Sequence, residues 1–215
     1  MHSLELYFLD AASDELRSVG FERLTDFGDG KAFARKATEG DLEYQLFLNL
    51  PRYSSHFVIE PSLGVFHAEA SRLMALFLGI PSSRTASIGS SLDDLVRKST
   101  GVSHHRQVSD SSLAFTEAKI LGRDVASYGE IYFSRFHTLG DVAQELLAQP
   151  RSILEDEHLA IAQALTGNAD SATDSLRSIA GTLRNQPPMM ATQTRTFLAS
   201  FRDYFGLSLD DLDPL

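Results

Sequence analysis

Four side chains that are able to hold a metal ion or move a proton lie in the segment HFVIEPSLGVFHAEA: His56, Glu60, His67 and Glu69. Imidazole and carboxylate groups are the usual ligands of zinc and iron, and they also serve as general acids and bases. On a strand, His56 and Glu60 would lie about 13 Å apart along the axis, too far for both to bind one ion directly. Residues two apart on a helix do not face each other, so His67 and Glu69 do not pair at a helix start. The pattern therefore favours a strand that passes into a helix, with Glu69 stabilising the positive end of the helix dipole.

The sequence signals for other chemistries are incomplete. The chain has no cysteine, which excludes disulfides, thiolate metal sites and cysteine nucleophiles. The spacing His67-Ala68-Glu69 matches the H-x-E of zinc deaminases, but their metal site also needs a P-C-x-x-C segment. The segment GDGKAF lacks the spacing of a phosphate-binding loop, and no G-x-S-x-G elbow accompanies the adjacent histidines His104 and His105. We therefore expect no catalytic, cofactor or metal site. The alternative is a metal-dependent or acid-base hydrolase with a site formed by His56, Glu60, His67 and His104.

Composition and charge limit the class of protein and of partner. At 215 residues, with 43% hydrophobic and 22% charged residues, the chain is long enough to bury an ample core and is not disordered. The N-terminus lacks the basic region of a signal peptide, and no run approaches the roughly 18 apolar residues that cross a bilayer, so we expect a soluble cytoplasmic protein. The net charge of -10 repels phosphate backbones and attracts basic surfaces. We therefore expect a basic protein partner, and neither nucleic acid nor a membrane; the sequence does not specify the oligomeric state.

Hydrophobic periodicity divides the first part of the chain into helix, hairpin, strand and helix. Apolar residues at helical spacing predict a helix over 3–18. The alternation in LEYQLFLNL predicts a strand, and KAFARKA predicts a shorter strand that is joined to it through a turn at Gly40. The segment SHFVIEPSLGVFH predicts a third strand, which Pro61 and Gly64 place at an edge or a bulge. A helix begins from His67.

The rest of the chain becomes progressively more helical. The segment LDDLVRK predicts a short helix, whereas AFTEAKILG and EIYFSRFHT predict two strands joined by RDVASYG. After Gly140, four segments with apolar periodicity predict helices, and proline or glycine separates them. The order of elements predicts an α+β fold, with an antiparallel sheet and flanking helices followed by an all-helical C-terminal part. The expected division is an α+β domain over 1–139 and a helical subdomain over 140–215, which pack together and can form one single domain.

One C-terminal segment resembles a known helical motif. LAIAQALTGNADSATDSL, near residues 157–184, is similar to a single tetratricopeptide-type hairpin, with Gly167 at the turn and Ala172 as the small residue where the helices approach. The pattern does not recur at the period of about 34 residues of that family. A lone hairpin supplies packing rather than a peptide-binding superhelix. A helical adaptor subunit is therefore a further alternative function.

Candidate partner-binding residues come from exposed aromatic, basic and acidic positions. Phe47 lies on the otherwise polar face of its strand, and Tyr53 follows Arg52 in a polar segment; aromatic and arginine residues are the usual anchors of protein interfaces. The densest local acidic charge is close to the C-terminus. It consists of Asp203, Asp210, Asp211 and Asp213.

The segments LRSVGFERLTDFGDGKAFARK and LEYQLFLNL carry a second resemblance. A helix that ends in Gly-Phe and is followed by a hairpin with aromatic and basic residues resembles small uncharacterised bacterial α+β domains of the toxin-immunity kind. The resemblance covers about the first 80 residues and transfers no catalytic residue. It implies a non-enzymatic acidic binding protein that inhibits a basic toxin or nuclease. Such a binder uses complementary charge to accelerate association, so its binding weakens with added salt.

Overall fold

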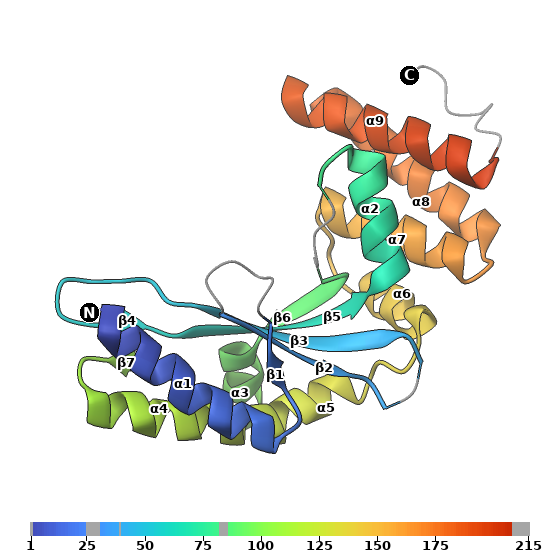
Figure 1. Ribbon diagram of the computed structural model, residues 1–215. Coiled ribbons are helices and arrows are strands. Elements are labelled where there is room, and N and C mark those ends of the chain that lie inside the picture. Colours follow the sequence, from blue (N-terminus) through green and yellow to red (C-terminus); the bar gives the residue numbers. More distant parts are fainter. Residues whose placement is uncertain (1, 25–30, 39, 82–85, 208–215) are drawn as a thin grey trace. The chain divides into compact units, whose positions relative to one another are not determined.

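The structure is a computed structural model that describes residues 2–24, 31–38, 40–81 and 86–207 (Figure 1). The fold is α+β, with a five-stranded antiparallel sheet in the N-terminal half and helices in the C-terminal part. The chain forms two compact units. Unit 1 consists of Met1–Val65 and Gly89–His137, and unit 2 consists of Phe66–Ile88 and Thr138–Leu215. Unit 2 thus includes a segment that the division drawn from the sequence assigned to the N-terminal domain.

The sheet of five strands has the order β1-β2-β3-β5-β6. These strands are β1 (Glu22–Arg23), β2 (Ala32–Lys36), β3 (Leu42–Asn49), β5 (Glu60–His67) and β6 (Ile88–Ser91). The predicted antiparallel hairpin of β2 and β3 is confirmed, with Phe33 opposite Leu46. Gly40 at the turn has a φ of 77°, and a Cβ there would lie 2.7 Å from the backbone oxygen of His137, so only glycine fits. A separate antiparallel pair is formed by β4 (Phe57–Val58) and β7 (Gln107–Val108).

The prediction for the third strand segment is wrong at Pro61 and Gly64. The chain leaves strand geometry at Ile59, between β4 and β5, but β5 runs without interruption through both residues and lies between β3 and β6. Pro61 is the second residue of β5, close to the strand start where its missing N–H is tolerated. Pro61, Leu63 and Val65 alternate onto one buried face. Burial of that face fixes the strand and its register.

The helices of unit 1 lie on the same side of the sheet (Figure 1). They are α1 (His2–Ser18), α3 (Leu92–Thr100), α4 (Ser111–Asp124), the π-helical turn η1 (Val125–Gly129) and α5 (Glu130–Phe133). The predicted helix over 3–18 is confirmed by α1. The two strands predicted in AFTEAKILG and EIYFSRFHT are wrong, because these segments form α4 and α5. Ala114, Ala118 and Gly122 recur every four residues and let α4 pack closely on α1, where a Cβ at Gly122 would lie 2.9 Å from the Cβ of Glu15.

The buried face of β3 carries the core of unit 1. Its alternating residues Leu42, Tyr44, Leu46 and Leu48 are buried, as the period of two predicts. The Tyr44 ring stacks on Phe133 with 4.5 Å between centroids, and its hydroxyl donates a hydrogen bond of 2.8 Å to the backbone oxygen of Phe136. The sheet and the end of α5 are therefore held together by both apolar and polar contacts.

The described part of unit 2 is mainly helical, as predicted for the C-terminal part, and it also contains the end of β5 and the start of β6. Its elements are α2 (Ala68–Leu78), α6 (Leu139–Leu147), α7 (Ile153–Leu165), α8 (Ala169–Thr182), the 3-10 turn η2 (Leu183–Asn185) and α9 (Pro188–Phe205). α2 packs on α7 and α9, with Phe77 at the centre of an aromatic cluster that includes Phe197 and Phe201 at 5.8 and 5.6 Å between centroids. Among the described helices, none combines the length and the apolar character needed to cross a membrane.

Candidate functional site

The histidines and acidic residues of the HFVIEPSLGVFHAEA segment make separate local contacts. His56 stacks on Tyr53, with 4.9 Å between ring centroids and 15° between planes. The Glu60 carboxylate accepts a hydrogen bond of 2.6 Å from the Asn49 amide. Both residues belong to unit 1, whereas His67 belongs to unit 2. Within the described residues, no group of three or more histidine, aspartate or glutamate side chains is placed to hold a metal ion.

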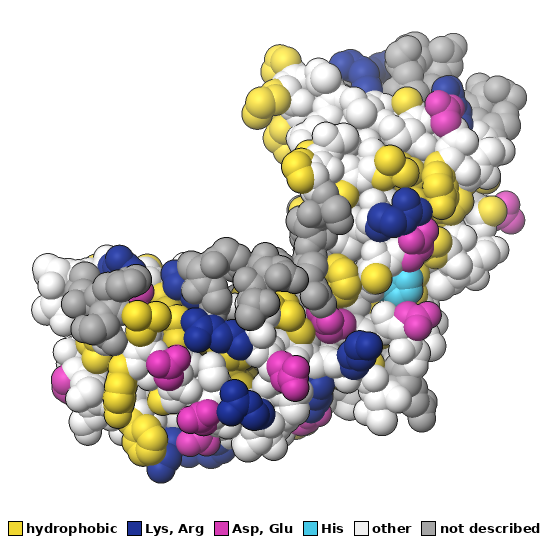
Figure 2. All heavy atoms as spheres, in the orientation of Figure 1, with side chains coloured by type: hydrophobic (Ala, Val, Ile, Leu, Met, Phe, Trp, Pro, Cys, Tyr) yellow, Lys and Arg dark blue, Asp and Glu magenta, His cyan; other side chains and the backbone are white. Residues whose placement is uncertain are grey.

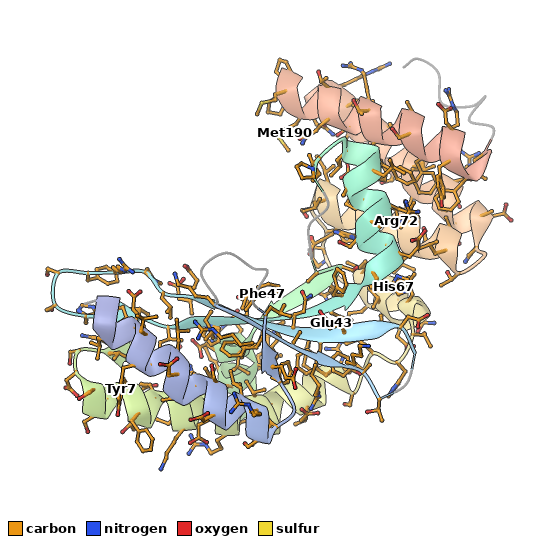
Figure 3. All side chains as sticks on the ribbon, viewed as in Figure 1. Tyr7, Glu43, Phe47, His67, Arg72 and Met190 are labelled. Atoms are coloured by element: carbon orange, nitrogen blue, oxygen red, sulfur yellow. The ribbon has the colours of Figure 1, made fainter. Side chains whose placement is uncertain are left out.

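His67 and Glu69 have structural partners near the start of α2, where Figure 3 labels His67 and Arg72. The His67 side chain is the N-cap, and its Nδ1 accepts a hydrogen bond of 3.1 Å from the backbone N–H of Ala70. Glu69 lies in the first helical turn, as predicted, and accepts two hydrogen bonds of 2.8 and 2.7 Å from Arg72. These bonds lower the pKa of Glu69 below its usual range. Arg72 also donates to the Tyr204 hydroxyl at 3.2 Å, so this corner joins α2 to α9.

His104 lies half-buried beside a charged cluster in unit 1. Arg106 is 1% exposed and donates hydrogen bonds to Asp124 at 2.6 Å and to Asp93 at 2.8 Å. Burial lowers the pKa of Arg106, but the two hydrogen bonds and the negative charges of Asp124 and Asp93 together outweigh burial and raise it. Burial raises the pKa of the neighbouring Glu117, and the charges of Arg106 and His104 partly oppose this. The paired charges link α3 to α4, which gives the cluster a structural role.

The three predicted interface residues of unit 1 differ in their surroundings. Phe47 is half-buried and shares a face of β3 with Glu43 (Figure 3). Arg52 is exposed but binds the buried Glu5 carboxylate through two hydrogen bonds, so its guanidinium is engaged within unit 1. Tyr53 is 53% exposed although its ring contacts His56. Tyr53 is therefore the most accessible of the three.

The acidic C-terminal residues are described only in part. Asp203 is exposed, lies in the last turn of α9 and pairs with Arg202 at 2.9 Å. Asp210, Asp211 and Asp213 lie outside the described residues.

A small pocket opens in unit 2 between α2, α7 and α9. Its volume is about 120 Å³. The apolar part of its wall comes from Leu78, Ile153, Leu154 and Met190, and the polar part comes from Glu157, Gln193 and Thr194. Leu154 and Met190 are 46% and 43% exposed, and the adjacent Met189 is 81% exposed. Figure 2 shows hydrophobic side chains at this edge of unit 2, and Figure 3 places Met190 there at the start of α9.

Three consecutive acidic residues follow the first two residues of α7, and among the described residues the third has no compensating partner. Glu155 forms a capping box with Ser152, and Asp156 binds Arg151. Glu157 is 4% exposed, and its carboxylate forms no hydrogen bond or ion pair within the described part of the chain. Burial, with a smaller contribution from the charge of Asp156, raises the pKa of Glu157 to about 7. A buried acid with such a pKa at a pocket wall is characteristic of a functional site.

His158 is a second buried titratable group of α7. It is 2% exposed, and both ring nitrogens lack a hydrogen-bond partner among the described residues. Burial lowers the pKa of His158 to about 4, against a smaller opposing effect of Glu155. The ring is therefore neutral at physiological pH and does not neutralise Glu157.

Unit 1 exposes an apolar patch of its own on α1 and α4, which pack side by side. Figure 2 shows hydrophobic side chains over these two helices. The exposed members are Leu6, Tyr7, Leu113 and Phe115. Lys119 covers part of this patch, since its ammonium lies 4.4 Å from the centroid of the Phe115 ring.

Glu157 is not recognisable in the sequence as a buried acid, because two other acidic residues directly precede it. In SILEDEHLAIAQALTG it follows Glu155 and Asp156, where acidic residues normally complement the helix dipole. A signal was present in the spacing, since Glu157 lies four residues after Ile153 and four before Ile161. Residues four apart share one helix face, so this glutamate belongs to the apolar stripe of α7.

Comparison with known proteins gives no match: no protein-family model, no curated protein and no solved structure matches the chain.

Proposed function

We propose that the chain is a non-enzymatic acidic protein that binds a basic protein partner, in the manner of an immunity protein that inhibits a toxin or nuclease. The observation that carries the proposal is the pocket of unit 2, where the buried Glu157 carboxylate has no partner within the described residues and the surrounding rim is apolar. A buried charge without a partner is costly, and a cation supplied by another molecule removes that cost.

The surroundings of the pocket have the composition of a protein interface. Methionine adapts its shape to different partners, and Met189 and Met190 are both exposed beside the pocket. Apolar anchors next to a polar group are typical of interface centres. The net charge of -10 adds a long-range attraction for a basic surface.

A capture experiment with purified protein tests this function. Immobilised protein is exposed to lysate of the native host at low salt, washed at high salt, and the released protein is identified by mass spectrometry. The partner is then produced alone and titrated by calorimetry at two salt concentrations. The proposal predicts one basic partner that forms a defined complex with an affinity that falls with added salt. Capture of neutral or acidic proteins, or binding that is insensitive to salt, would contradict it.

A further inference from the structure

The pocket of unit 2 has the size of a single side chain. Its volume is about 120 Å³, whereas an apolar cavity of about 150 Å³ accepts a benzene molecule. It opens among exposed apolar residues, Leu154, Met189 and Met190, which a small free molecule would leave uncovered. A side chain that projects from a protein surface would fill the pocket while its own surroundings cover the apolar rim.

The polar residues of the pocket wall indicate which functional group the bound side chain carries. Glu157 is 4% exposed as a residue, and its carboxylate forms no hydrogen bond or ion pair within the described residues. Its raised pKa has the same cause, since burial without a compensating charge disfavours the ionised form. A positive charge beside Glu157 would pair with this carboxylate in a water-poor site, where such a pair is strongest.

The pocket matches an ammonium better than a guanidinium. An ammonium has three N–H donors, and the pocket is lined by three residues whose side chains carry oxygen acceptors, Glu157, Gln193 and Thr194. The Thr194 hydroxyl donates its own proton to the Gln186 side-chain oxygen at 3.0 Å, which leaves its lone pairs to accept. A guanidinium is planar and has five donors in a fixed fork, for which the lining residues offer too few acceptors.

The rest of the wall suits an aliphatic stem. Leu78, Ile153, Leu154 and Met190 line the same pocket as Glu157 and supply its apolar surface. Lysine buries its four-carbon stem along such a surface while its ammonium pairs with a polar group. We infer that this pocket receives a lysine side chain of the partner protein, with its ammonium bound to Glu157 and its stem against Leu154 and Met190. This inference rests on the proposed function, since it names the partner group that the same surface binds.

Methionine methyl signals report on the pocket directly. The chain has only four methionines, so a protein labelled with ¹³C in the methionine methyl groups gives a simple NMR spectrum. Met190 lines the pocket and Met74 is buried elsewhere in unit 2, which makes Met74 an internal control. The ligands are Nα-acetyl-lysine N-methylamide and the corresponding blocked arginine and norleucine. Norleucine has the same carbon stem as lysine but no ammonium.

The expected result is a saturable shift of the Met190 signal with blocked lysine and no shift of Met74. Blocked arginine and norleucine should bind at least tenfold more weakly. Glu157→Gln should weaken the binding of blocked lysine at least tenfold, whereas the matched control Asp170→Asn removes an exposed carboxylate of the same unit and should leave it unchanged. No shift of Met190, equal binding of the three ligands, or equal binding to the Glu157→Gln variant would overturn the lysine site.

The capture experiment and the NMR titration together distinguish a failure of the lysine site from a failure of the proposed function. If blocked lysine binds at Met190 but lysate yields no basic partner, the lysine site stands and the proposed function fails. If a basic partner is captured and binds equally to the wild type and the Glu157→Gln variant, the proposed function stands and the lysine site fails.

Discussion

The Glu157→Gln substitution removes the ionisable group of the pocket while it keeps the shape of the side chain and one hydrogen-bonding oxygen. The wild-type carboxyl has an ordinary pKa of 4.5 in the unfolded chain and a pKa of about 7 in the folded chain. Between these two values the folded protein binds a proton that the unfolded chain does not bind. Stability from this proton is therefore fully present below pH 4.5 and is lost as the pH rises through about 7.

The size of the effect follows from the difference between the two pKa values. At about 1.4 kcal/mol per pH unit, ionisation of Glu157 lowers the free energy of unfolding by about 3 kcal/mol at pH 8 and by less than about 1 kcal/mol at pH 5. Glutamine has no charge to bury, so the variant should be more stable than the wild type by these amounts. For the whole chain of 215 residues unfolding as one cooperative unit, the gain at pH 8 corresponds to a rise in Tm of about 6–12 °C.

In the wild type, the titration of His158 offsets the pH dependence of stability that Glu157 causes. Its pKa falls from 6.5 to about 4 on folding, so the unfolded chain binds a proton in this window and the folded chain does not. Its contribution to stability is therefore lost as the pH falls from 6.5 to 4, whereas that of Glu157 rises as the pH falls from 7 to 4.5. The two contributions oppose each other, so only the difference between wild type and variant isolates Glu157.

The assay is thermal unfolding followed by circular dichroism at pH 5 and pH 8, in dilute solution because the pI is about 5.1. Asp170→Asn serves as the control, since it removes an exposed carboxylate at the start of α8 and should change stability by less than about 1 kcal/mol. A Glu157→Gln variant that melts at or below the wild-type temperature at pH 8 would refute the reasoning, because the carboxylate would then have a compensating partner. An equal gain at both pH values would refute it too, since it would reflect packing rather than ionisation.

Three further substitutions test the other buried or capping groups. In the wild type, the unfolded chain takes up a proton at His158 between pH 6.5 and pH 4, which favours unfolding. In His158→Leu this contribution is absent, so the free energy of unfolding measured in urea should be about 3 kcal/mol higher at pH 4, relative to its value at pH 7, than in the wild type. Arg106→Leu removes the buried cation of Asp124 and leaves it only the longer contact of 3.5 Å with the exposed Arg123, so it should cost about 3–5 kcal/mol in urea unfolding. The added change Asp124→Leu should recover part of this loss, and no recovery would contradict the paired cluster. His67→Ala should lower stability by about 1 kcal/mol in thermal melts through loss of the α2 cap, and His67→Asn should retain it; a loss several times larger would show that His67 does more than cap the helix.

Elements with a strong hydrophobic period could be predicted from the sequence, whereas elements that depend on tertiary packing could not. The alternation of β3 and the helical period of α1 each indicate a buried face that the structure also shows, so local pattern and tertiary structure agree. Packing alone buries all of residues 157–163 in α7. In α4 the buried residues Ala114, Ala118 and Gly122 are small rather than strongly apolar, so they do not by themselves indicate a helix. Their role becomes clear only from the close packing of α1 against them. Such a contact joins segments about 100 residues apart, which no local pattern contains.

The same distinction applies to the candidate site. His56, Glu60 and His67 are neighbours in the sequence, but their partners are Tyr53, Asn49 and a helix N-terminus. The wall of the pocket instead combines residues from α2, α7 and α9, which are far apart in the chain. Residues that are close in the sequence therefore have separate structural contacts, whereas Glu157, which is unpaired within the described residues, is recognised only from the packing of the three helices.

The position of Glu157 joins stability and binding in one group. A glutamine or a leucine there would spare the folded chain the cost of a buried charge, which the pKa of about 7 sets at about 3 kcal/mol in alkaline solution. Residues that lower stability in the free protein are found at functional sites, where a ligand compensates for the loss. A lysine of the partner would neutralise this carboxylate, and any ligand that binds only the folded state raises the apparent stability. The variant that is most stable alone, Glu157→Gln, should thus gain the least from the partner, and this inverse relation connects the pH dependence of folding to the proposed lysine site.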